Sequence, residues 1–175
     1  IMIKLKNILS EGRSLYVFDF DDTLARSEAY IYVKKRDGSE LTLDPAEYAV
    51  YKEEPGDEFD FRDFNKMLRN PVAIKDNMRD LKKALSNRQN KVTVLTARAL
   101  AFPLRYYFKK QHGISPYVVG VASADPKKKS NWIEKHIKKG YTTIYFADDS
   151  AKNIRAVDAL KAKYPNVKIK TKLVK

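Results

Sequence analysis

The sequence predicts an α/β protein with a Rossmann-like parallel sheet and helices on both faces. Two observations support this prediction. Apolar, β-branched and aromatic runs of strand length alternate along the chain with stretches of helical periodicity. Three of the runs end in small polar or acidic residues, beginning at Asp19, Thr96 and Asp148. Because the binding crevice of an open α/β sheet lies outside the carboxyl ends of its strands, we expect these residues to share one site.

Composition narrows the class of protein. The 175 residues allow one domain with a small appended module, and 43% of them are hydrophobic. The chain has no cysteine, which excludes disulfides, thiolate metal sites and cysteine catalysis. Its two histidines, His112 and His136, lie in lysine-rich helical stretches, and we expect both on the surface. With no apolar run of membrane-spanning length and no signal-peptide pattern, we expect a cytoplasmic protein without a membrane partner.

The net charge points to polyanionic partners. Lysine and arginine number 35 against 22 aspartates and glutamates, a formal charge of +13. Such a surface attracts polyanions, and nucleic acid is the commonest of them. The alternative is a lysine-rich surface that only keeps the protein in solution. No helix-turn-helix or aromatic-rich single-strand binding motif stands out.

Residues 1–13 precede the predicted core domain, residues 14–175. Apolar residues from Ile3 to Leu9 have near-helical spacing, so we expect an amphipathic segment that either packs outside the sheet or is mobile. Leu9-Ser10-Glu11 also resembles the cleavage signal of targeting peptides on tailed-phage internal proteins, for which the location would be the host cytoplasm. A pattern of only three residues is, however, common by chance.

The first predicted strand, Leu15–Phe18, runs into a cluster of acids. Asp19, Asp21 and Asp22 follow it directly, and Thr23 comes next. Carboxylates beside a buried strand are costly unless a cation or a reacting group compensates them. Side chains two residues apart leave an extended chain on the same side, so Asp19 and Asp21 should converge. Paired carboxylates suit a hard cation such as Mg²⁺.

The acidic cluster has two other interpretations. Acidic triplets are common in solvated turns, and a calcium-binding EF-hand loop also begins with this spacing. An EF-hand that began at Asp19 would need glycine at its sixth position and glutamate at its twelfth, where this chain has Leu24 and Tyr30. The solvated turn is disfavoured because the same strand-then-polar pattern recurs after Val92–Leu95 and Thr143–Phe146.

An insertion separates the acidic cluster from the next strand. It covers residues 26–71 and begins with a predicted β-hairpin turning at Asp37-Gly38. Asp44-Pro45 has the pattern of a helix start, and Pro55-Gly56 ends that helix. A second apolar-faced segment covers Phe59–Leu68. The insertion is either a lid over the site or an extra layer on the core.

The remaining elements alternate regularly. The helix of residues 102–112 should end at Gly113 as its C-cap. The last strand alternates apolar residues with lysine, which is typical of an edge strand protected by charge. The predicted helices are Lys75–Asn90, Phe102–His112, Lys127–Gly140 and Ala151–Lys163, and the further strands are Tyr117–Val121 and Val167–Val174.

The chemistry-bearing residues follow a recognisable order. An Asp-x-Asp-x-Thr motif at Asp19–Thr23 is followed by Thr96 after a strand, then a lysine, then Asp148-Asp149. This order resembles the haloacid dehalogenase (HAD) superfamily of phosphohydrolases, from about Ser14 to about Leu160 outside the insertion. The resemblance implies a HAD fold, bound Mg²⁺, and a small C1-type cap formed by the insertion. A small cap leaves the site open, which favours a large substrate such as a polymer end.

The resemblance also implies roles for individual residues. Asp19 would be the nucleophile that forms an aspartyl-phosphate, and Asp21 the general acid and then base, with a raised pKa that neighbouring carboxylates supply. Thr96 and a lysine would bind the phosphoryl group. The implied metal ligands are Asp19, the backbone carbonyl of Asp21, Asp148 and Asp149, and the implied substrate-binding residues are Thr23, Thr96, Ala97, Arg98 and Lys129.

Three assignments stay open. Of the adjacent Lys127, Lys128 and Lys129, we favour Lys129, because its spacing to the apolar residues of the same helix turns it towards the site. The other two then belong to a solvated helix face. Arg98 either reaches the substrate or forms a surface ion pair. Asp22 occupies a position at which many family members carry glycine, though aspartate is also common there.

These expectations combine into a function. The chain is expected to be a Mg²⁺-dependent phosphomonoesterase acting on phosphorylated nucleic-acid ends or nucleotides, with a general likeness to the phosphatase domains of nucleic-acid end-repair enzymes. One alternative is a phosphatase of small metabolites. The other is a basic nucleic-acid-binding or virion protein on a HAD scaffold, in which hydrolysis is secondary.

Overall fold

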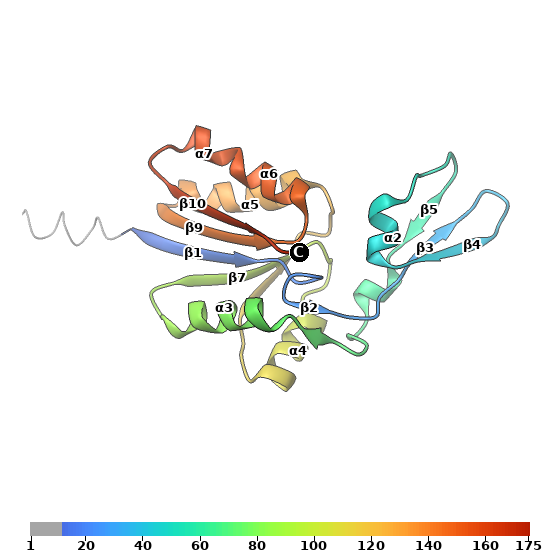
Figure 1. Ribbon diagram of the computed structural model, residues 1–175, viewed down its shortest axis with the longest axis horizontal. Coiled ribbons are helices and arrows are strands. Elements are labelled where there is room, and N and C mark those ends of the chain that lie inside the picture. Colours follow the sequence, from blue (N-terminus) through green and yellow to red (C-terminus); the bar gives the residue numbers. More distant parts are fainter. Residues whose placement is uncertain (1–11) are drawn as a thin grey trace, which may run out of the picture.

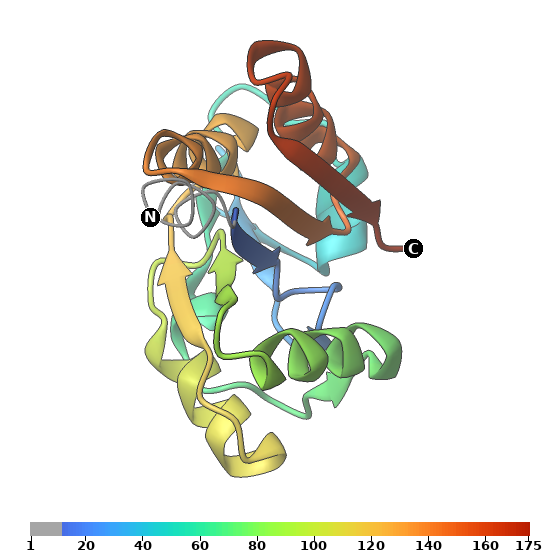
Figure 2. The ribbon, with the colours of Figure 1, turned by 90° about the vertical axis from the view of Figure 1, so that its left-hand side faces the viewer.

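The computed structural model describes residues 12–175, which form a three-layered core and a projecting insertion (Figure 1). The core sheet has five parallel strands in the order β10-β9-β1-β7-β8, with helices on both faces (Figure 2). The predicted α/β architecture is therefore confirmed, as is the edge position of the last strand. The core elements are β1 (Arg13–Phe18), α3 (Lys75–Ser86), β7 (Lys91–Thr96), α4 (Phe102–His112), β8 (Tyr117–Gly120), α5 (Pro126–Lys138), β9 (Tyr141–Asp148), α6 (Ala151–Asp158), α7 (Leu160–Lys163) and β10 (Lys168–Leu173).

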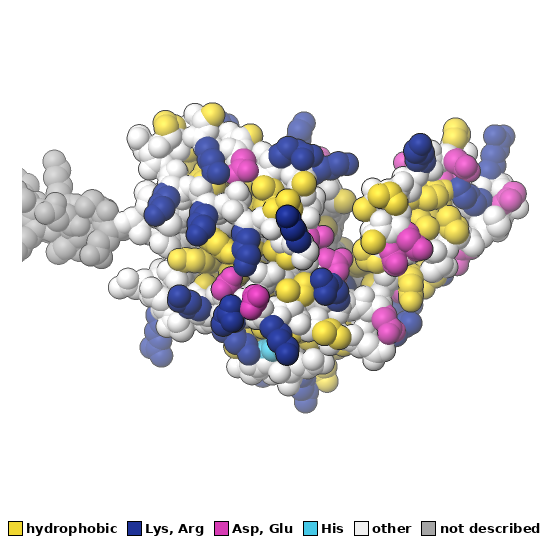
Figure 3. Space-filling view, in the orientation of Figure 1, with side chains coloured by type: hydrophobic (Ala, Val, Ile, Leu, Met, Phe, Trp, Pro, Cys, Tyr) yellow, Lys and Arg dark blue, Asp and Glu magenta, His cyan; other side chains and the backbone are white. Residues whose placement is uncertain are grey.

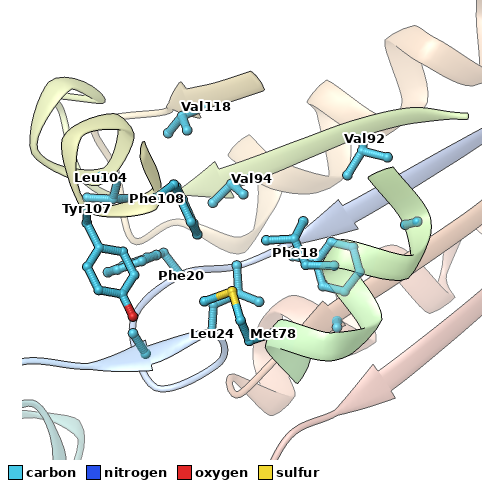
Figure 4. Packing of buried hydrophobic residues seen from close by; sticks show 14 of the residues in the cluster. Phe18, Phe20, Leu24, Met78, Val92, Val94, Leu104, Tyr107, Phe108 and Val118 are labelled. Atoms are coloured by element: carbon cyan, nitrogen blue, oxygen red, sulfur yellow. The ribbon is translucent and has the colours of Figure 1, made fainter. Parts of the chain in front are cut away.

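Each face of the sheet has its own hydrophobic core. On one face, side chains of α3 and α4 pack on the sheet together with Phe18 and Phe20 (Figure 4). On the other face, α5, α6 and α7 cover Leu15 and Val17 of the same strand. The alternation of side chains along β1 therefore supplies both cores, as expected for a central strand buried on both sides.

The insertion leaves and re-enters the core through a short antiparallel ribbon. In this ribbon Ala25 pairs with Ala73 and Arg26 with Val72. The predicted hairpin is present as β3 and β4, with Gly38 in its turn at a positive φ of 86°. A third strand, β5, pairs with the other edge of β3. The insertion elements are β2 (Ala25–Arg26), β3 (Ile31–Lys34), β4 (Glu40–Leu43), α2 (Pro45–Val50), β5 (Glu58–Asp60), η1 (Arg62–Asn65) and β6 (Val72–Ala73).

Local capping explains the short helix of the insertion. The Asp44 side chain accepts a hydrogen bond from the Glu47 backbone N–H, and the Glu47 side chain accepts one from the Asp44 backbone N–H, both at 2.8 Å. This reciprocal capping box satisfies two N–H groups that a helix start leaves free. It confirms the helix that the Asp44-Pro45 pattern predicted.

Charge is divided unevenly between the core and the insertion. Residues 26–71 contain eight lysines and arginines against eleven aspartates and glutamates, a net charge of −3. The rest of the chain therefore has a net charge of +16. The basic character predicted for the whole protein thus lies outside the insertion.

Several expectations differ from the structure. The expectation of a surface position for His136 is wrong: the residue is buried, its ring lies 4.0 Å from that of Trp132, and its Nδ1 contacts the Trp132 carbonyl. His112 is half-buried against the Tyr107 hydroxyl. The helix predicted to run unbroken over residues 151–163 is divided at Ala159.

The predicted segment 1–13, apart from its last two residues, and the tripeptide Leu9-Ser10-Glu11 lie outside the described residues. Within residues 12–175, no helix combines the length and the apolar character needed to cross a membrane.

One buried hydroxyl gives a stability prediction. Within the described part of the chain, the Thr93 side-chain oxygen is buried without a hydrogen-bond partner. An unpaired buried polar group costs about 1 kcal/mol or more, so Thr93→Val should raise the free energy of unfolding by about 1 kcal/mol in urea denaturation. The matched control is Thr171→Val, which should lower it, because the Thr171 hydroxyl donates to Asp158 at 2.9 Å. A drop in stability in Thr93→Val would contradict the assignment.

Candidate active site

The three predicted polar strand ends meet at one edge of the core sheet. Asp19 follows β1, Thr96 ends β7 and Asp148 ends β9, and these strands are adjacent and parallel. The Asp19 backbone N–H donates to the Ala147 carbonyl at 2.9 Å, which ties the end of β1 to the end of β9. Figure 3 shows acidic side chains at the end of the core that faces the insertion.

Phe20 fixes the acidic turn after β1. Its ring is fully buried and packs edge-on against Tyr107 and Phe108, with centroids 5.6 Å apart in both cases (Figure 4). Its carbonyl accepts hydrogen bonds from the backbone N–H groups of residues 23, 24 and 25. Asp22 in this turn has a φ of 59°, the left-handed conformation that glycine adopts without strain and aspartate tolerates. The backbone of this turn can therefore accommodate either glycine or aspartate at position 22.

Lys129 joins two of the strand ends. Its buried ammonium donates to Asp19 Oδ1 at 2.5 Å and to Asp148 Oδ2 at 2.8 Å. Burial alone would lower the pKa of Lys129, but the two carboxylates outweigh it and hold the pKa above its ordinary value. Lys127 and Lys128, by contrast, are exposed. Of the three adjacent lysines, the structure thus brings only Lys129 into the cluster.

Asp148 is held by three hydrogen-bond donors. Its Oδ1 accepts from the Ser150 backbone N–H at 2.8 Å, and its Oδ2 accepts from Asn153 Nδ2 at 3.0 Å as well as from Lys129. The neighbouring Asp149 is exposed, and the Thr23 hydroxyl donates to it at 3.5 Å. Asp148 is therefore fixed in orientation, while Asp149 faces solvent.

Burial and mutual repulsion act on the carboxylates of the cluster. Burial, followed by the charges of Asp148, Asp149 and Asp21, raises the pKa of Asp19 well above its ordinary value, although Lys129 opposes this. The Asp149 side chain reaches the surface but is partly desolvated by the surrounding cluster, and this desolvation, followed by the charge of Asp148, raises the pKa of Asp149 to about 6. Both shifts come first from desolvation and then from neighbouring negative charge that one ammonium does not neutralise.

Arg98 binds Asp21 instead of facing the surface. Its Nε and Nη2 donate to the two oxygens of Asp21 at 2.8 and 2.6 Å, and its Nη1 donates to the Phe64 carbonyl of the insertion at 3.2 Å. The side chain is buried, so the alternative of a surface ion pair is wrong. The charged group that contacts Asp21 is thus the Arg98 guanidinium. The sequence-based expectation was that neighbouring carboxylates would be the groups that act on Asp21.

The loop after β7 depends on a glycine in the next strand. A Cβ on Gly120 would lie 2.4 Å from the Arg98 carbonyl oxygen and 2.9 Å from that of Ala99. Within the loop, Thr96 is buried and its hydroxyl oxygen accepts from the Arg98 backbone N–H at 3.2 Å, whereas Ala97 is exposed. Thr96 is thereby oriented with its hydroxyl proton still available for donation.

Sequence reasoning missed three contributors to this cluster. Asn153 and Gly120 support Asp148 and Arg98, and Asn77 Nδ2 donates to the Thr23 carbonyl at 2.9 Å. Asparagine and glycine are common for many local reasons, and nothing in the sequence distinguishes these three positions. Their roles depend on contacts between distant segments.

The donor set fits a hard divalent cation. Asp19, Asp148 and Asp149 each offer a carboxylate oxygen, and these oxygens lie within 4.8 Å of one another. Carboxylate oxygens are the ligands that Mg²⁺ prefers. The neighbouring carboxylates also contribute to the raised pKa values of Asp19 and Asp149, as expected where negative charges are close together. An ammonium, a hydroxyl and converging carboxylates are the groups needed to hold a phosphoryl group beside a metal ion.

Comparisons with protein-family models, with curated proteins and with solved structures found no match.

Removal of the central ammonium should destabilise the fold. Lys129→Met leaves buried Asp19 and Asp148 facing each other, and breaking a buried ion pair in this way costs about 3 kcal/mol. The destabilisation should shrink as the pH falls from 7 towards 5, because the raised pKa of Asp19 lets a proton replace the ammonium. Urea unfolding at both pH values measures it. The exposed Lys128→Met is the control and should change stability by less than about 0.5 kcal/mol; an equal effect in both variants would contradict the central role of Lys129.

Proposed function

We propose that the protein is a Mg²⁺-dependent phosphomonoesterase of the HAD type, with Asp19 as its nucleophile. The observation that supports this best is the convergence of Asp19, Asp148 and Asp149 within 4.8 Å, with the Lys129 ammonium bonded to two of them. Paired carboxylates with a buried ammonium and a free hydroxyl suit phosphoryl transfer better than they suit a purely structural role, since their mutual repulsion is otherwise unfavourable.

The reaction divides into two displacements. An Asp19 carboxylate oxygen attacks phosphorus, the bond from phosphorus to the ester oxygen breaks, and the departing oxygen takes a proton from Asp21. Asp21 then accepts a proton from water as that water attacks the aspartyl-phosphate, which releases inorganic phosphate and restores Asp19. Arg98 orients Asp21 through two hydrogen bonds, so release of one of them accompanies proton transfer at this carboxyl group.

The other residues bind charge. Lys129 neutralises Asp19 and the phosphoryl group together, and Thr96 donates to a phosphoryl oxygen. Asp19, the Asp21 backbone carbonyl, Asp148 and Asp149 would hold Mg²⁺, which when bound screens the repulsion between the anionic nucleophile and the anionic phosphate. These roles follow the resemblance of the motifs to the HAD superfamily and agree with the placement of the side chains.

Phosphorylated nucleic-acid ends or nucleotides are the substrates that we propose. The chain outside the insertion has a net charge of +16, so this part of the protein attracts polyanions. The insertion is a small three-stranded module joined to the core by one ribbon, and as a C1-type cap it would leave room for a polymer end. Both features favour a large anionic substrate over a small metabolite.

The nucleophile provides the direct test. The purified protein should hydrolyse an aryl phosphate in the presence of Mg²⁺, and Asp19→Asn should abolish turnover by removing the attacking oxygen anion. Asp22→Asn is the control, since Asp22 has no role in the proposed reaction and pairs with Arg26 at 3.8 Å, and it should retain most of the activity. Absence of turnover by the unmodified protein on a broad panel of phosphomonoesters would refute the proposal.

The metal site provides a second, pH-dependent test. The pKa of Asp149 is raised to about 6, so below pH 6 a proton competes with Mg²⁺ for this carboxylate. The increase in Tm caused by a fixed Mg²⁺ concentration should therefore be small at pH 5 and larger at pH 7, as thermal unfolding with and without Mg²⁺ would show. In Asp149→Asn this contrast should diminish. An equal increase at both pH values in the unmodified protein would contradict the assignment.

A further inference from the structure

One face of the core sheet is only partly covered by helices. Helices α3 and α4 pack on this face near β7 and β1, whereas the helices beside β9 and β10 lie on the opposite face. Within residues 12–175, no helix lies over the β9–β10 part of the face that Figure 1 turns towards the viewer. The side chains that point outwards here are therefore a surface of the protein.

The side chains on this face form regular rows across three strands. Strand register puts Lys168 beside Thr143, and Lys170 beside Tyr145, which in turn lies beside Tyr16 of β1. The next row has Lys172 beside Ala147. On the opposite face, the same strands carry the buried apolar residues of the second core. Three lysines of β10 thus share one face, and we call Lys168, Lys170 and Lys172 the β10 lysine row.

Among the residues that the structure describes, two of the three lysines in the β10 lysine row have no acidic partner. Lys168 and Lys170 are exposed and form no ion pair with any described residue, and Lys172 contacts Asp80 at 3.1 Å. Residues two apart in a strand are separated by about 6.6 Å, so the row is about 13 Å long. Figure 3 shows lysine and arginine side chains along the line of β10 on this face.

The row leads to the candidate active site. Leu173, the residue after the row, pairs with Asp148, and the Val174 N–H donates to the Asp148 carbonyl at 3.0 Å. Lys172 Nζ also donates to Asn77 Oδ1 at 2.7 Å, and Asn77 Nδ2 donates to the Thr23 carbonyl at 2.9 Å. Two hydrogen bonds therefore connect the last lysine of the row to the acidic turn.

Aromatic rings lie beside the lysines. Tyr16 and Tyr145 are half-buried, and their ring centroids are 5.6 Å apart in the row of Lys170. A basic track with adjacent aromatic rings is how many proteins bind single-stranded nucleic acid, because the lysines pair with phosphates and the rings stack with bases. The acidic insertion, with a net charge of −3, offers no such attraction.

We propose that the β10 lysine row binds the sugar–phosphate backbone of a single-stranded nucleic acid and directs its phosphorylated end to Asp19. This inference rests on the proposed function for the chemistry at Asp19, but the binding itself does not require turnover. The net charge does not indicate which surface of the protein attracts a polyanion. The inference assigns that attraction to the β10 lysine row.

Protection of the sheet edge is the competing explanation for these lysines. Charged residues on an edge strand prevent edge-to-edge association of sheets, and they do so with either sign of charge. Charge reversal therefore separates the two explanations. Lys168→Glu combined with Lys170→Glu keeps the edge charged while it repels phosphates. The matched control, Lys135→Glu combined with Lys138→Glu, makes the same change in net charge on exposed residues of α5, which covers the opposite face.

The experiment measures binding of a short 3′-phosphorylated, fluorescently labelled single-stranded oligonucleotide by anisotropy across salt concentrations. All proteins carry Asp19→Asn, so that the phosphate is retained, and urea unfolding checks that each is folded. The β10 variant should bind about tenfold or more weakly at low salt, and its log–log salt slope should fall by about 0.7 for each phosphate that the lysines no longer neutralise. The α5 variant should bind much as the parent does.

Three outcomes would overturn the inference. Equal weakening in the β10 and α5 variants would mean that net charge alone attracts the strand. Unchanged binding in the β10 variant would mean that the lysines serve only to protect the edge, and tighter binding of a duplex of the same sequence would exclude a single-strand site. A protein that binds the strand at the β10 row but hydrolyses no phosphomonoester would refute the proposed function and leave this surface standing.

Discussion

The buried ammonium of Lys129 is the interaction on which the candidate site depends. Three carboxylates at the ends of two parallel strands are mutually repulsive and partly desolvated, and the hydrogen bonds from Lys129 to Asp19 and Asp148 allow them to come together. The ammonium comes from the first turns of a helix that packs on the sheet through Ile133 and Ile137. The packing of α5 on the sheet thus positions the Lys129 ammonium, and the ammonium in turn offsets the repulsion among the clustered carboxylates.

A second cation organises the other half of the site. Arg98 binds both oxygens of Asp21, so the two acids that lie two residues apart after β1 have different partners. Asp19 shares its ammonium with Asp148, whereas Asp21 has a guanidinium of its own. This separation gives two chemically similar side chains distinct environments, which is the condition under which neighbouring carboxyl groups perform different tasks.

Sequence patterns predicted the parts of the fold that local physics determines. The strands are apolar runs, the short helix after Asp44 followed from its capping residues, and the hairpin followed from Asp37-Gly38. The β2–β6 ribbon was missed because two paired residues on each side have no periodicity. At the site, the sequence indicated which acids belong together, but not the pairing of Arg98 with Asp21, since these residues are 77 positions apart and either could have had a solvent-exposed partner. His136 was misplaced for a similar reason, because its burial depends on Trp132 and on Tyr141 of the following strand.

The contact between Arg98 and the Phe64 carbonyl has a mechanical consequence. One guanidinium holds Asp21 through two of its N–H groups and the insertion through a third, so these two parts of the molecule share a single rigid planar group. A rotation of the insertion that withdraws this carbonyl leaves a buried N–H without an acceptor, and the guanidinium must then turn to find another. Because the guanidinium is planar, it cannot turn without also changing its two hydrogen bonds to Asp21. The hydrogen bonding of the Asp21 carboxyl group therefore depends on the position of the insertion.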